Sequence, residues 1–496
     1  MHTLLGSNSG FHATGLKQRR TKIVATLGPA TASPEAILRL VGQGVDVFRL
    51  NFSHGSHAQH AEAVSHVRNA AARAGRHVAV LADLCGPKIR VGRFPNGSIP
   101  LVAGTTVTVT TREVEGAEGL IPSEYDHLHS DVTVGSRLLL DDGNLELEVE
   151  QLAGQDLTCR VLRGGTLSNR KGMNLPGVTL STPALTEKDR ADATFAVGLG
   201  VDLLALSFVR SPKDVMDLRD LLDALGREVP IVAKIEKPEA LRVIGYVLQV
   251  ADGIMVARGD LGVEVPAEEV PVIQQELVRL CVAAGKPVIV ATQMLESMIH
   301  ASRPTRAEVT DVAWAAMGGT DAVMLSGETA SGAYPFAAVE TMDRVLRRVE
   351  AHQWSHGQFA GLVHHVLSAA QELRDEDAAR SEAVSRAIAH LSRELQVRAI
   401  VVPTLYGRMA RLVSSERPAA PIVALSALAS TCQSLALLWG VTPVLEPAET
   451  LRDPELRARA VVLEMGLADA GQNVLLVYDA SAARDGSRPT VSVLRV

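Results

Sequence analysis

Eight short apolar runs rich in valine, isoleucine and leucine recur through the first two thirds of the chain and constrain its fold more than any other feature. Runs of this kind are typical of strands buried on both faces, and segments of helical period lie between them. Several of these segments open with Ser-Pro or close with Gly, as helix boundaries do, for example SPEAILRLVGQG, SPKDVMDLRDLLDALG and PVIQQELVRLCVAAG. The runs themselves read KIVATLGP, DVFRLNFSH, HVAVLADL, VDLLALSFV, PIVAKIE, DGIMVARGD, KPVIVATQM and DAVMLSGE.

Eight strand–helix units in an α/β chain predict a (β/α)8 TIM barrel. A doubly wound open sheet is the alternative, but the count of eight and the polar ends of nearly every run favour closure. One unit is interrupted from Val91 to about Lys171, where period-2 stretches such as TTVTVT and LELEVE alternate with Gly, Pro and Asn turns. This pattern predicts a small antiparallel β domain. Because the insertion follows the third strand, we expect it to overhang the C-terminal mouth of the barrel as a movable lid.

After about residue 360, helical segments alternate with the apolar runs RAIVVPT, PIVALSA, GVTPVL and QNVLLVYDA, and the chain ends on TVSVLRV. This alternation predicts a separate doubly wound α/β domain. We therefore expect four regions: a loose tail at 1–16, the barrel at 17–90 and 172–350, a β-rich lid at 91–171, and a C-terminal α/β domain at 360–496.

Composition limits the partners of this 496-residue chain. Its 49 lysines and arginines against 56 aspartates and glutamates give a net charge of −7, which argues against a general binder of nucleic acid or anionic membranes. No stretch approaches the roughly 18 apolar residues of a membrane span. The four cysteines lie far apart without a CxxC pair, which fits a reducing compartment, and hence the cytoplasm, better than a disulfide framework or a zinc site.

Charged and polar side chains follow the apolar runs where the barrel mouth is expected. The stretch LADLCGPKIR runs a strand into Asp83 and then turns onto Lys88 and Arg90. Alternate side chains of a strand share a face, so in FRLNFSHG the polar set points together into the mouth. The alternative is an ordinary solvated strand end. The polar set consists of Arg49, Asn51 and Ser53.

Two further runs place carboxylates at the same rim. IVAKIEKPEA puts Lys234 and Glu236 two apart on one face, and VARGDLG delivers Asp260 from the next strand. A structural Lys–Glu pair is the alternative reading of the first motif. Two carboxylates with no His or Cys nearby form an all-oxygen site that suits Mg²⁺ or Mn²⁺, and magnesium implies phosphate.

Hydroxyls and cations complete the predicted rim. Thr292 of ATQML and Ser326 of MLSGET could order water or bind a phosphate oxygen. The chain has neither a Walker A sequence nor a Gly-rich loop of the protein-kinase type, so side-chain cations and a metal would hold a nucleotide phosphate. The available cations are Arg49, Arg90, Lys171 and Lys234.

Seven stretches occur in the order in which pyruvate kinases carry them, and the chain resembles that family from about residue 17 to 496. The resemblance implies a TIM barrel with an inserted β-barrel lid domain and a C-terminal α/β domain used for regulation and oligomerisation. It also implies a cytoplasmic homotetramer that transfers the phosphoryl group of phosphoenolpyruvate to ADP and forms pyruvate and ATP, the last step of glycolysis. The stretches are RRTKIVATLGPA, FRLNFSHG, KIEKPEAL, GIMVARGDLGVEVP, ATQMLESMI, RPTRAEVTDVA and DAVMLSGETASGAYP.

The same resemblance implies roles for individual residues. Lys234 would lie beside the transferring phosphoryl group and the enolate oxygen, and Glu236 and Asp260 would hold Mg²⁺, or Mn²⁺, on the substrate. The backbone of Gly259 and the hydroxyl of Thr292 would bind the carboxylate of phosphoenolpyruvate. A metal and an ammonium aimed at the enolate oxygen lower its energy as it develops.

The remaining implied roles concern phosphates and a proton. Arg49 would contact the phosphate of phosphoenolpyruvate, and a water ordered by Thr292 and Ser326 is the preferred donor of the proton to the enolate. The nucleotide would be held as the lid closes by Asn51, His54, Arg90 and Lys171.

In potassium-requiring members of the family, a monovalent cation lies next to the substrate phosphate and the position of Lys88 is a glutamate. A second branch carries lysine there, usually with leucine at the position of Leu84, and works without potassium; this chain resembles that branch. A tethered ammonium beside Asp83 can supply the field of the missing ion. Alternatively, Lys88 merely faces solvent at a turn. The residues that match the cation ligands are Asn51, Ser53, Asp83 and the backbone carbonyl of Leu84.

The C-terminal domain departs from the family at its sugar-phosphate loop. In TLYGRMARLVSSERP, Thr404 and Gly407 remain, but Tyr406 and Met409 stand where small hydroxyl residues are usual. The closing DGSRPTVSVLRV also departs from the customary Gly-Thr-Asn stretch. Backbone amides at the following helix could still bind a phosphate. We expect weak or absent activation by fructose 1,6-bisphosphate.

Two other functions are weighed against this one. A lyase or aldolase that handles phosphoenolpyruvate would share the metal and the enolate, but it would have no use for a lid that carries Lys171. A non-catalytic regulatory relative would be expected to lose Lys234, Glu236 or Asp260, and all three are present. A fold alone never establishes activity, so the argument depends on these residues.

Overall fold

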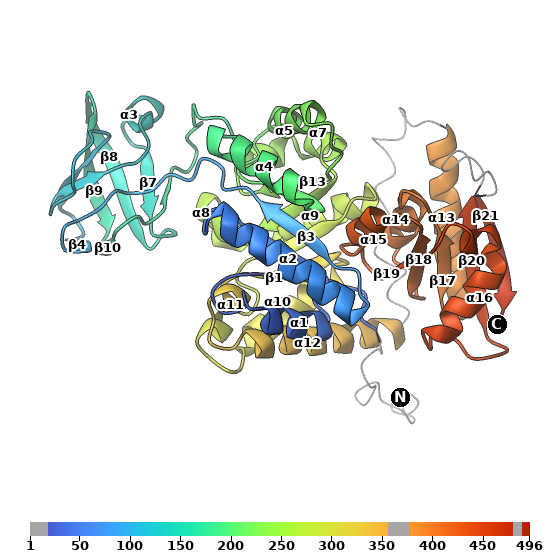
Figure 1. Cartoon of the computed structure of the whole chain (residues 1–496). Helices are drawn as coiled ribbons and strands as arrows, with labels where there is room; N and C mark the ends of the chain where they lie inside the picture. The colour runs from blue at the N-terminus through green and yellow to red at the C-terminus, as the bar shows by residue number, and fades with distance from the viewer. Residues whose placement is uncertain (1–17, 356–375, 480–488) are drawn as a thin grey trace, which may run out of the picture.

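The computed structural model describes residues 18–355, 376–479 and 489–496. The tail expected at 1–16 and the start of the C-terminal region expected at 360 lie outside these residues. The described chain forms three parts in a row, with a central barrel between a lid and a C-terminal domain (Figure 1). The two chain segments that join the lid to the barrel run close together.

Eight parallel strands close into a barrel in the order β1-β16-β15-β14-β13-β12-β3-β2, so the predicted fold class is confirmed. Each strand lies within one of the eight apolar runs of the sequence. Polar and charged residues follow the carboxyl ends of the strands, which meet at one mouth. The strands are β1 (Lys22–Thr26), β2 (Val47–Asn51), β3 (Ala79–Asp83), β12 (Leu203–Leu206), β13 (Ile231–Ile235), β14 (Gly253–Ala257), β15 (Val288–Ala291) and β16 (Ala322–Leu325).

Helices surround this barrel, and several begin where the sequence supplies a capping box. At the start of α10, for example, Thr305 accepts from the backbone of Glu308 while the Glu308 carboxylate accepts from the backbone of Thr305. The barrel helices are α1 (Pro34–Gly42), α2 (His57–Ala74), α4 (Glu187–Leu199), α5 (Pro212–Ala224), α6 (Pro238–Arg242), α7 (Ile244–Val250), α8 (Arg258–Glu264), α9 (Val270–Ala283), α10 (Arg306–Met317), α11 (Gly327–Ala330) and α12 (Pro335–Ser355).

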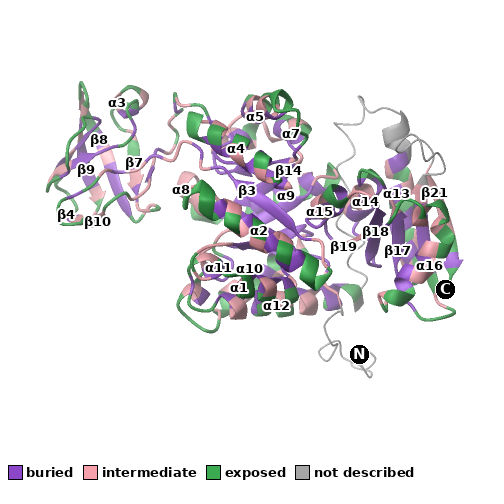
Figure 2. Ribbon diagram, viewed as in Figure 1, coloured by how far each residue is buried: buried purple, intermediate pink, exposed green. Residues whose placement is uncertain are grey.

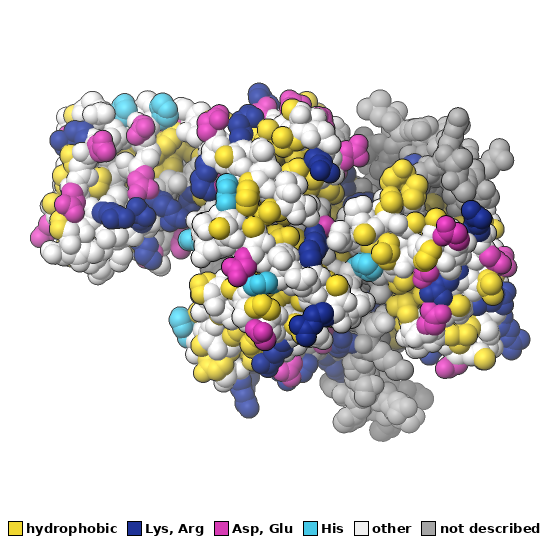
Figure 3. Space-filling model, in the orientation of Figure 1, with side chains coloured by type: hydrophobic (Ala, Val, Ile, Leu, Met, Phe, Trp, Pro, Cys, Tyr) yellow, Lys and Arg dark blue, Asp and Glu magenta, His cyan; other side chains and the backbone are white. Residues whose placement is uncertain are grey.

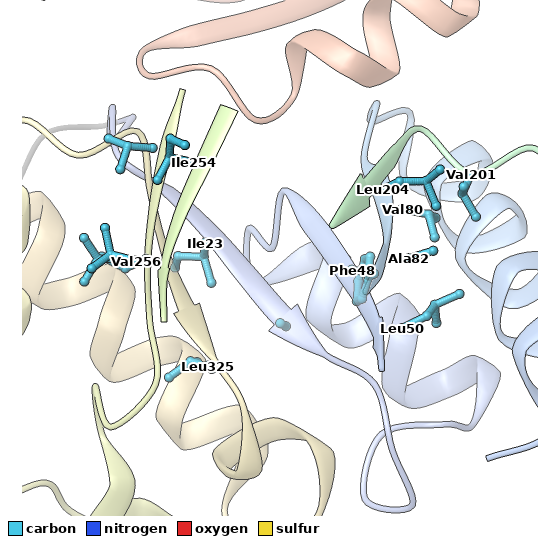
Figure 4. Close-up of a cluster of buried hydrophobic side chains, with 14 of the residues drawn as sticks. Ile23, Phe48, Leu50, Val80, Ala82, Val201, Leu204, Ile254, Val256 and Leu325 are labelled. Carbon is cyan, nitrogen blue, oxygen red and sulfur yellow. The ribbon is translucent and has the colours of Figure 1, made fainter. Parts of the chain in front are cut away.

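Alternate side chains of the barrel strands form two separate apolar clusters. Ile23, Phe48 and Leu50 belong to the outer cluster, which packs against the helices (Figure 4). Their neighbours Val24 and Val47 belong to the inner cluster, which fills the barrel. The barrel is therefore a packed core, buried throughout its strands (Figure 2), and only its mouth is free to carry polar groups.

The lid is built mainly from one six-stranded sheet in the order β11-β7-β8-β9-β5-β6, with β4 and β10 paired separately. Contrary to the antiparallel expectation, β5 and β6 are parallel. The nine residues between them carry the chain back along β5, so that β6 runs in the same direction as β5. The last strand also lies beyond the expected end at residue 171. The lid elements are β4 (Ser98–Leu101), β5 (Thr106–Thr110), β6 (Leu120–Pro122), α3 (Leu128–Asp131), β7 (Arg137–Leu140), β8 (Leu145–Ala153), β9 (Asp156–Arg163), β10 (Gly165–Ser168) and β11 (Met173–Asn174).

The C-terminal domain is a five-stranded sheet in the order β19-β18-β17-β20-β21, parallel except for the antiparallel edge strand β21. Separate apolar clusters on its two faces include side chains of α13, α14 and α15 on one face and of α16 on the other, which is the predicted doubly wound arrangement. The elements are α13 (Glu376–Glu394), β17 (Ile400–Pro403), α14 (Arg408–Ser415), β18 (Ile422–Ser426), α15 (Ala429–Leu435), β19 (Val441–Leu445), α16 (Pro454–Glu464), β20 (Asn473–Asp479) and β21 (Pro489–Arg495).

Surface charge is mixed over the described residues of the face in Figure 3, where positive and negative side chains are interspersed on all three parts of the molecule. Among the described helices, none combines the length and the apolar character needed to cross a membrane.

The C-terminal domain closes the end of the barrel opposite the mouth. Ala436 and Leu437 belong to the same buried cluster as the inner strand residues. Next to them, the Arg417 guanidinium lies 2.8 Å from the Asp321 carboxylate, and the two side chains are only 2 % and 3 % exposed. The backbone N–H of Trp439 donates to the other carboxylate oxygen at 3.1 Å. Apolar packing and a buried ion pair therefore join the two domains.

Replacement of Arg417 by methionine is expected to destabilise the protein by about 3–5 kcal/mol, because it leaves the Asp321 charge buried without its partner. Arg344→Met is the matched control, since Arg344 pairs with Glu340 at the surface and its side chain is 67 % exposed. Urea midpoints of the three proteins measure the difference. Equal midpoints for Arg417→Met and the control would contradict this view of the interface.

Candidate active site at the barrel mouth

The centre of the mouth is a buried carboxylate shared by two cations from different strands. Asp83 ends β3 and is 1 % exposed. Its Oδ2 lies 2.6 Å from Nε of Arg49 on β2, and its Oδ1 lies 3.2 Å from Nζ of Lys234 on β13. A second guanidinium nitrogen of Arg49 donates to Thr26 Oγ1 at 3.2 Å. The structure thus brings together the acid and two of the cations that the sequence singled out.

Glu236 completes this cluster one residue beyond the end of β13. Its Oε1 lies 2.9 Å from Nζ of Lys234, and its Oε2 accepts from the backbone N–H of Phe208 at 2.8 Å. The Lys234 ammonium also donates to the hydroxyl of Ser207 at 2.6 Å. Lys234 is therefore bound from three sides, and its side chain is 11 % exposed.

Burial and charge act against each other on these groups. Burial alone would lower the pKa of Lys234, but Asp83 and Glu236 outweigh it and raise that pKa, so the ammonium stays charged. Burial would raise the pKa of Asp83, but Lys234 and Arg49 hold it below its ordinary value. For Glu236, burial and the nearby charge of Asp260 outweigh Lys234 and raise its pKa.

Asp260 approaches the cluster from the first turn of α8, directly after β14. Its Oδ1 lies 3.7 Å from Nζ of Lys88, and both side chains are about one-third exposed (29 % and 31 %). The carboxylates of Asp260 and Glu236 lie near enough for the charge of Asp260 to raise the pKa of Glu236. Within the described part of the chain, no group of three or more His, Cys, Asp and Glu side chains is arranged to hold a metal. A metal at the mouth would therefore need ligands from substrate or water in addition to these two.

Thr292, which directly follows β15, has a left-handed backbone with a φ of 69°. Its Oγ1 accepts from the backbone N–H of Gly259 at 2.7 Å, and its carbonyl accepts from the Arg258 guanidinium at 2.6 Å. A left-handed conformation is costly for a β-branched residue and persists only where its surroundings impose it. The Gly259 amide and the Thr292 hydroxyl are thus fixed side by side.

Ser326 directly follows β16 and has a buried hydroxyl without a hydrogen-bond partner. Its backbone N–H donates to the carboxylate of the fully buried Glu328 at 2.7 Å. A buried hydroxyl without a partner costs free energy, and such a group in a native structure points to a function or a bound water. The sequence placed Ser326 on the rim but gave no sign of Glu328 beneath it.

Two of the four candidate nucleotide ligands, Arg90 and Lys171, lie on the connection to the lid, whereas Asn51 and His54 lie at the end of β2. Arg90 bridges the two connecting segments, since it pairs with Gly172 and donates to the carbonyl of Arg170 at 3.0 Å. Lys171 lies 2.6 Å from Asp141 of the lid and is not part of the cluster around Asp83. His54 follows β2, and burial together with the charge of Arg90 lowers its pKa.

A cavity of about 520 Å³ opens between the barrel mouth and the lid. It combines charged side chains with the exposed backbone of α8. Its size is that of a small-molecule site, and polar groups converge on it from several elements. Its lining includes Lys88, Asp142, Arg258, Gly259, Asp260 and Gln293.

The position of Lys88 differs from the expectation that its ammonium would lie beside Asp83, among the residues that match the monovalent-cation ligands. The structure places its ammonium next to Asp260 and not next to Asp83, because Arg49, Lys234 and Ser207 already surround the Asp83 carboxylate. The carbonyl of Leu84 accepts from the Ser207 hydroxyl at 2.7 Å. Asn51 ends β2, and its side-chain oxygen accepts from the backbone N–H of Ser53 at 3.1 Å.

The loop between β17 and α14 uses its hydroxyls internally. Thr404 Oγ1 accepts from the backbone N–H of Gly407 at 3.0 Å. The hydroxyls of Ser426 and Thr431 both donate to the carbonyl of Leu405, at 3.2 and 2.8 Å. The three hydroxyls nearest this loop therefore hold its backbone, and Tyr406 is 65 % exposed.

Three site residues were missed by the sequence analysis. Ser207 and Phe208 lie at the end of β12, in an apolar run whose terminal polar residue was not singled out. Thr26, which supports Arg49, ends β1 in the same way. The signal was available, because Asn51, Asp83, Thr292 and Ser326 also stand at or just beyond the carboxyl ends of their strands.

Comparison with known proteins gives one family for the whole chain. The sequence model "Pyruvate kinase, barrel domain" matches residues 18–339, and "Pyruvate kinase, alpha/beta domain" matches residues 382–494. A pyruvate kinase of Mycobacterium intracellulare is 44 % identical over 96 % of this chain and 98 % of its own, and one of Geobacillus stearothermophilus is 43 % identical over 96 % and 80 %. The crystal structure of a pyruvate kinase from Cryptosporidium parvum matches with a TM-score of 0.87 at 34 % identity, covering 99 % of each chain. The barrel and the C-terminal sheet thus agree with these matches, and the chain belongs to the pyruvate kinase family.

Proposed function

We propose that the cluster around Asp83 transfers the phosphoryl group of phosphoenolpyruvate to ADP. The observation that carries this proposal is the Lys234 ammonium, buried at the mouth 2.9 Å from Glu236 and 3.2 Å from Asp83. Because these carboxylates raise its pKa, Lys234 remains a cation throughout the physiological pH range. A fixed positive charge is what the oxygen of a developing enolate requires.

Arg49 binds the phosphate of phosphoenolpyruvate in this proposal, and the Gly259 amide and Thr292 hydroxyl bind its carboxylate. The Gly259 amide donates to Thr292 Oγ1 at 2.7 Å and the Thr292 hydroxyl donates to the Ala291 carbonyl at 2.6 Å, so a bound carboxylate replaces existing contacts of two donors that already lie side by side. When the phosphoryl group leaves, Lys234 stabilises the enolate oxygen. A water held by Thr292 and the unpartnered hydroxyl of Ser326 then protonates the carbon, which completes pyruvate.

Glu236 and Asp260 are the proposed ligands of Mg²⁺, with Mn²⁺ as a substitute. The fit rests on the donor set: Glu236 follows β13 and Asp260 follows the adjacent strand β14, so two carboxylates meet at the mouth, and carboxylate oxygens are the ligands that Mg²⁺ prefers. When bound, the ion neutralises charge on the substrate oxygens. The protein contributes the two carboxylates and holds Glu236 from both sides through Lys234 and Phe208.

Asn51, His54, Arg90 and Lys171 are the proposed contacts of the nucleotide phosphates. Arg90 and Lys171 lie on the two segments that join barrel and lid, so lid movement changes their distance from the mouth. Lys171 is 45 % exposed in its pair with Asp141, and exposed pairs of this kind are weak. The lysine is therefore free to exchange Asp141 for a phosphate.

Replacement of Lys234 by methionine is expected to lower turnover by roughly 10²–10³ or more, with metal binding largely kept, because one preorganised charge at the developing oxyanion is lost. Replacement of Glu236 by glutamine is expected instead to raise the Mg²⁺ requirement sharply, because it neutralises one of two proposed carboxylate ligands. A Mg²⁺ titration of pyruvate formation separates the two variants. Unchanged turnover in Lys234→Met would refute the assignment.

We propose that the enzyme works without potassium. The support is the Lys88 ammonium, which lies 3.7 Å from Asp260 and so adds a tethered positive charge at the mouth. The Leu84 carbonyl, a ligand position in potassium-requiring relatives, accepts from Ser207. A second cation beside Lys88 would meet charge repulsion.

Full activity is therefore expected with Mg²⁺ in potassium-free buffer, whereas Lys88→Glu is expected to lose activity and to regain part of it when KCl is added. The measurement compares KCl with an equal ionic strength of a bulky organic cation. Strong activation of the unmodified protein by KCl would show that Lys88 does not replace the ion.

We propose that fructose 1,6-bisphosphate activates this enzyme weakly or not at all. The hydroxyls of Ser426 in β18 and Thr431 in α15 are both given to the Leu405 carbonyl, which leaves Thr404, whose oxygen accepts from Gly407, as the small hydroxyl donor of the loop itself. The half-saturating phosphoenolpyruvate concentration is expected to change less than about twofold at millimolar fructose 1,6-bisphosphate, a shift below about 0.4 kcal/mol. A large drop in that concentration would contradict the proposal.

We also propose a homotetramer. Two surfaces support association with further copies of the chain: the edge strand β21, where Val493 is 51 % exposed, and helix α10, where Trp314 and Met317 are 48 % and 41 % exposed. Large apolar side chains on an unpaired edge or an outer helix are typical of surfaces that bind another chain. Light scattering is expected to give about four times the chain mass.

A further inference from the structure

The two-residue turn Ser207-Phe208 lies directly after β12, between Lys234 and the connection to the lid. Both residues are buried, at 2 % and 8 % exposure. Phe208 has a left-handed backbone with a φ of 56°, which costs a bulky residue about 1–2 kcal/mol. Such strain persists only where surrounding contacts impose it, so the turn invites a functional explanation.

The Ser207 hydroxyl makes two short hydrogen bonds, and a third, longer contact of 3.5 Å joins it to Asp83 Oδ1. It donates to the Leu84 carbonyl at 2.7 Å and accepts from the Lys234 ammonium at 2.6 Å. A hydroxyl has a single proton, and once that proton is given to the carbonyl its lone pairs face the ammonium. Ser207 therefore fixes the position of Lys234 without adding negative charge, whereas Asp83 and Glu236 supply the charge that balances it.

Phe208 acts on the neighbouring carboxylate through its backbone. Its N–H donates to Glu236 Oε2 at 2.8 Å, which leaves Oε1 to Lys234 at 2.9 Å. The left-handed φ of Phe208 determines the direction of this N–H. One turn thus holds the ammonium with a side chain and the carboxylate with a backbone amide.

Gly86 provides the space that this turn occupies. A Cβ at Gly86 would lie 2.6 Å from Cδ2 of Phe208 and 3.1 Å from Cβ of Ser207, so the turn packs directly on the backbone of the LADLCGPKIR stretch. On its other side, the Lys237 ammonium lies 6.0 Å from the centre of the Phe208 ring. The turn therefore lies between the segments that follow β3 and β13 and contacts both.

We infer that Ser207 and Phe208 are positioning residues: Ser207 sets the place of the Lys234 ammonium for the chemical step, and Phe208 presets the Glu236 carboxylate for the divalent cation. This inference rests on the proposed roles of Lys234 and Glu236. The two roles are tested by different measurements. Loss of the Lys234 position is expected to lower kcat, and loss of the Glu236 position is expected to weaken binding of the divalent cation. Partners of this kind change activity or metal affinity by about 10–100-fold when they are lost.

The first test is Ser207→Ala. We expect kcat to fall by about 10–100-fold, while KM for phosphoenolpyruvate and ADP stays within about threefold and Mn²⁺ binds the substrate-free protein unchanged. Ser207→Cys, which keeps the size and a weaker acceptor, is expected to give an intermediate kcat. The matched control is Ser414→Ala, since Ser414 is 1 % exposed and donates to the Trp439 carbonyl at 2.7 Å far from the mouth.

The second test is Gly86→Ala against Gly75→Ala. Both glycines have a positive φ, 67° and 60°, but a Cβ at Gly75 meets nothing within 4 Å. The two variants therefore carry similar backbone strain, and only Gly86→Ala displaces the turn. We expect Gly86→Ala to raise the Mn²⁺ dissociation constant of the substrate-free protein about tenfold or more, and Gly75→Ala to leave it unchanged.

Either half of the inference can be overturned. A kcat for Ser207→Ala within about twofold of the unmodified protein, or an equal fall in Ser414→Ala, refutes the role of Ser207. Unchanged Mn²⁺ binding by Gly86→Ala refutes the role of Phe208. If the unmodified protein forms no pyruvate from phosphoenolpyruvate and ADP, the proposed function fails instead, and the Mn²⁺ measurements still report on the turn.

Discussion

The buried carboxylate of Asp83 is the interaction on which the mouth of the barrel depends. Arg49 and Lys234 are both withdrawn from water, and each would be strongly destabilising there without a partner. Asp83 lies against both, at 2.6 and 3.2 Å. It belongs to β3, whereas Lys234 belongs to β13, and β12 lies between these strands. The contact therefore forms only when these neighbouring strands are paired in the sheet, so the fold and the site are established together.

Charge balance explains why this cluster is suited to an anionic substrate that arrives with a metal. Arg49 and Lys234 are neutralised by Asp83 and Glu236, so the buried core of the site has no net charge. Asp260 then adds a negative charge at the rim, which Lys88 offsets across 3.7 Å. A phosphate and a carboxylate can enter such a site only with additional positive charge, which a divalent cation beside Glu236 and Asp260 would supply.

Much of the fold and of the site follows from local sequence patterns, because these patterns report physical preferences of single elements. Strand alternation placed Arg49 and Lys234 on the inner face of the mouth, and buried apolar runs located all eight barrel strands. The ion-pair partner of Lys88 could not be predicted from these patterns. A long side chain on a connecting segment takes the nearest free carboxylate, and Asp83 is already paired with Arg49 and Lys234. Leu437, which fills the far end of the barrel, was also not predicted, because only tertiary packing brings it there.

The two ends of the barrel differ in how firmly they are held. At the far end, movement of the C-terminal domain would expose Leu437 and separate the buried Arg417–Asp321 pair, and the loss of such a pair is costly. At the mouth, the lid is joined to the barrel by two segments, and Lys171 and Asp141 form an exposed pair within it. Exposed pairs contribute little, so rearrangement is far cheaper on this side. The same strands thus have one end fixed by packing and one accessible end, where charged side chains are collected.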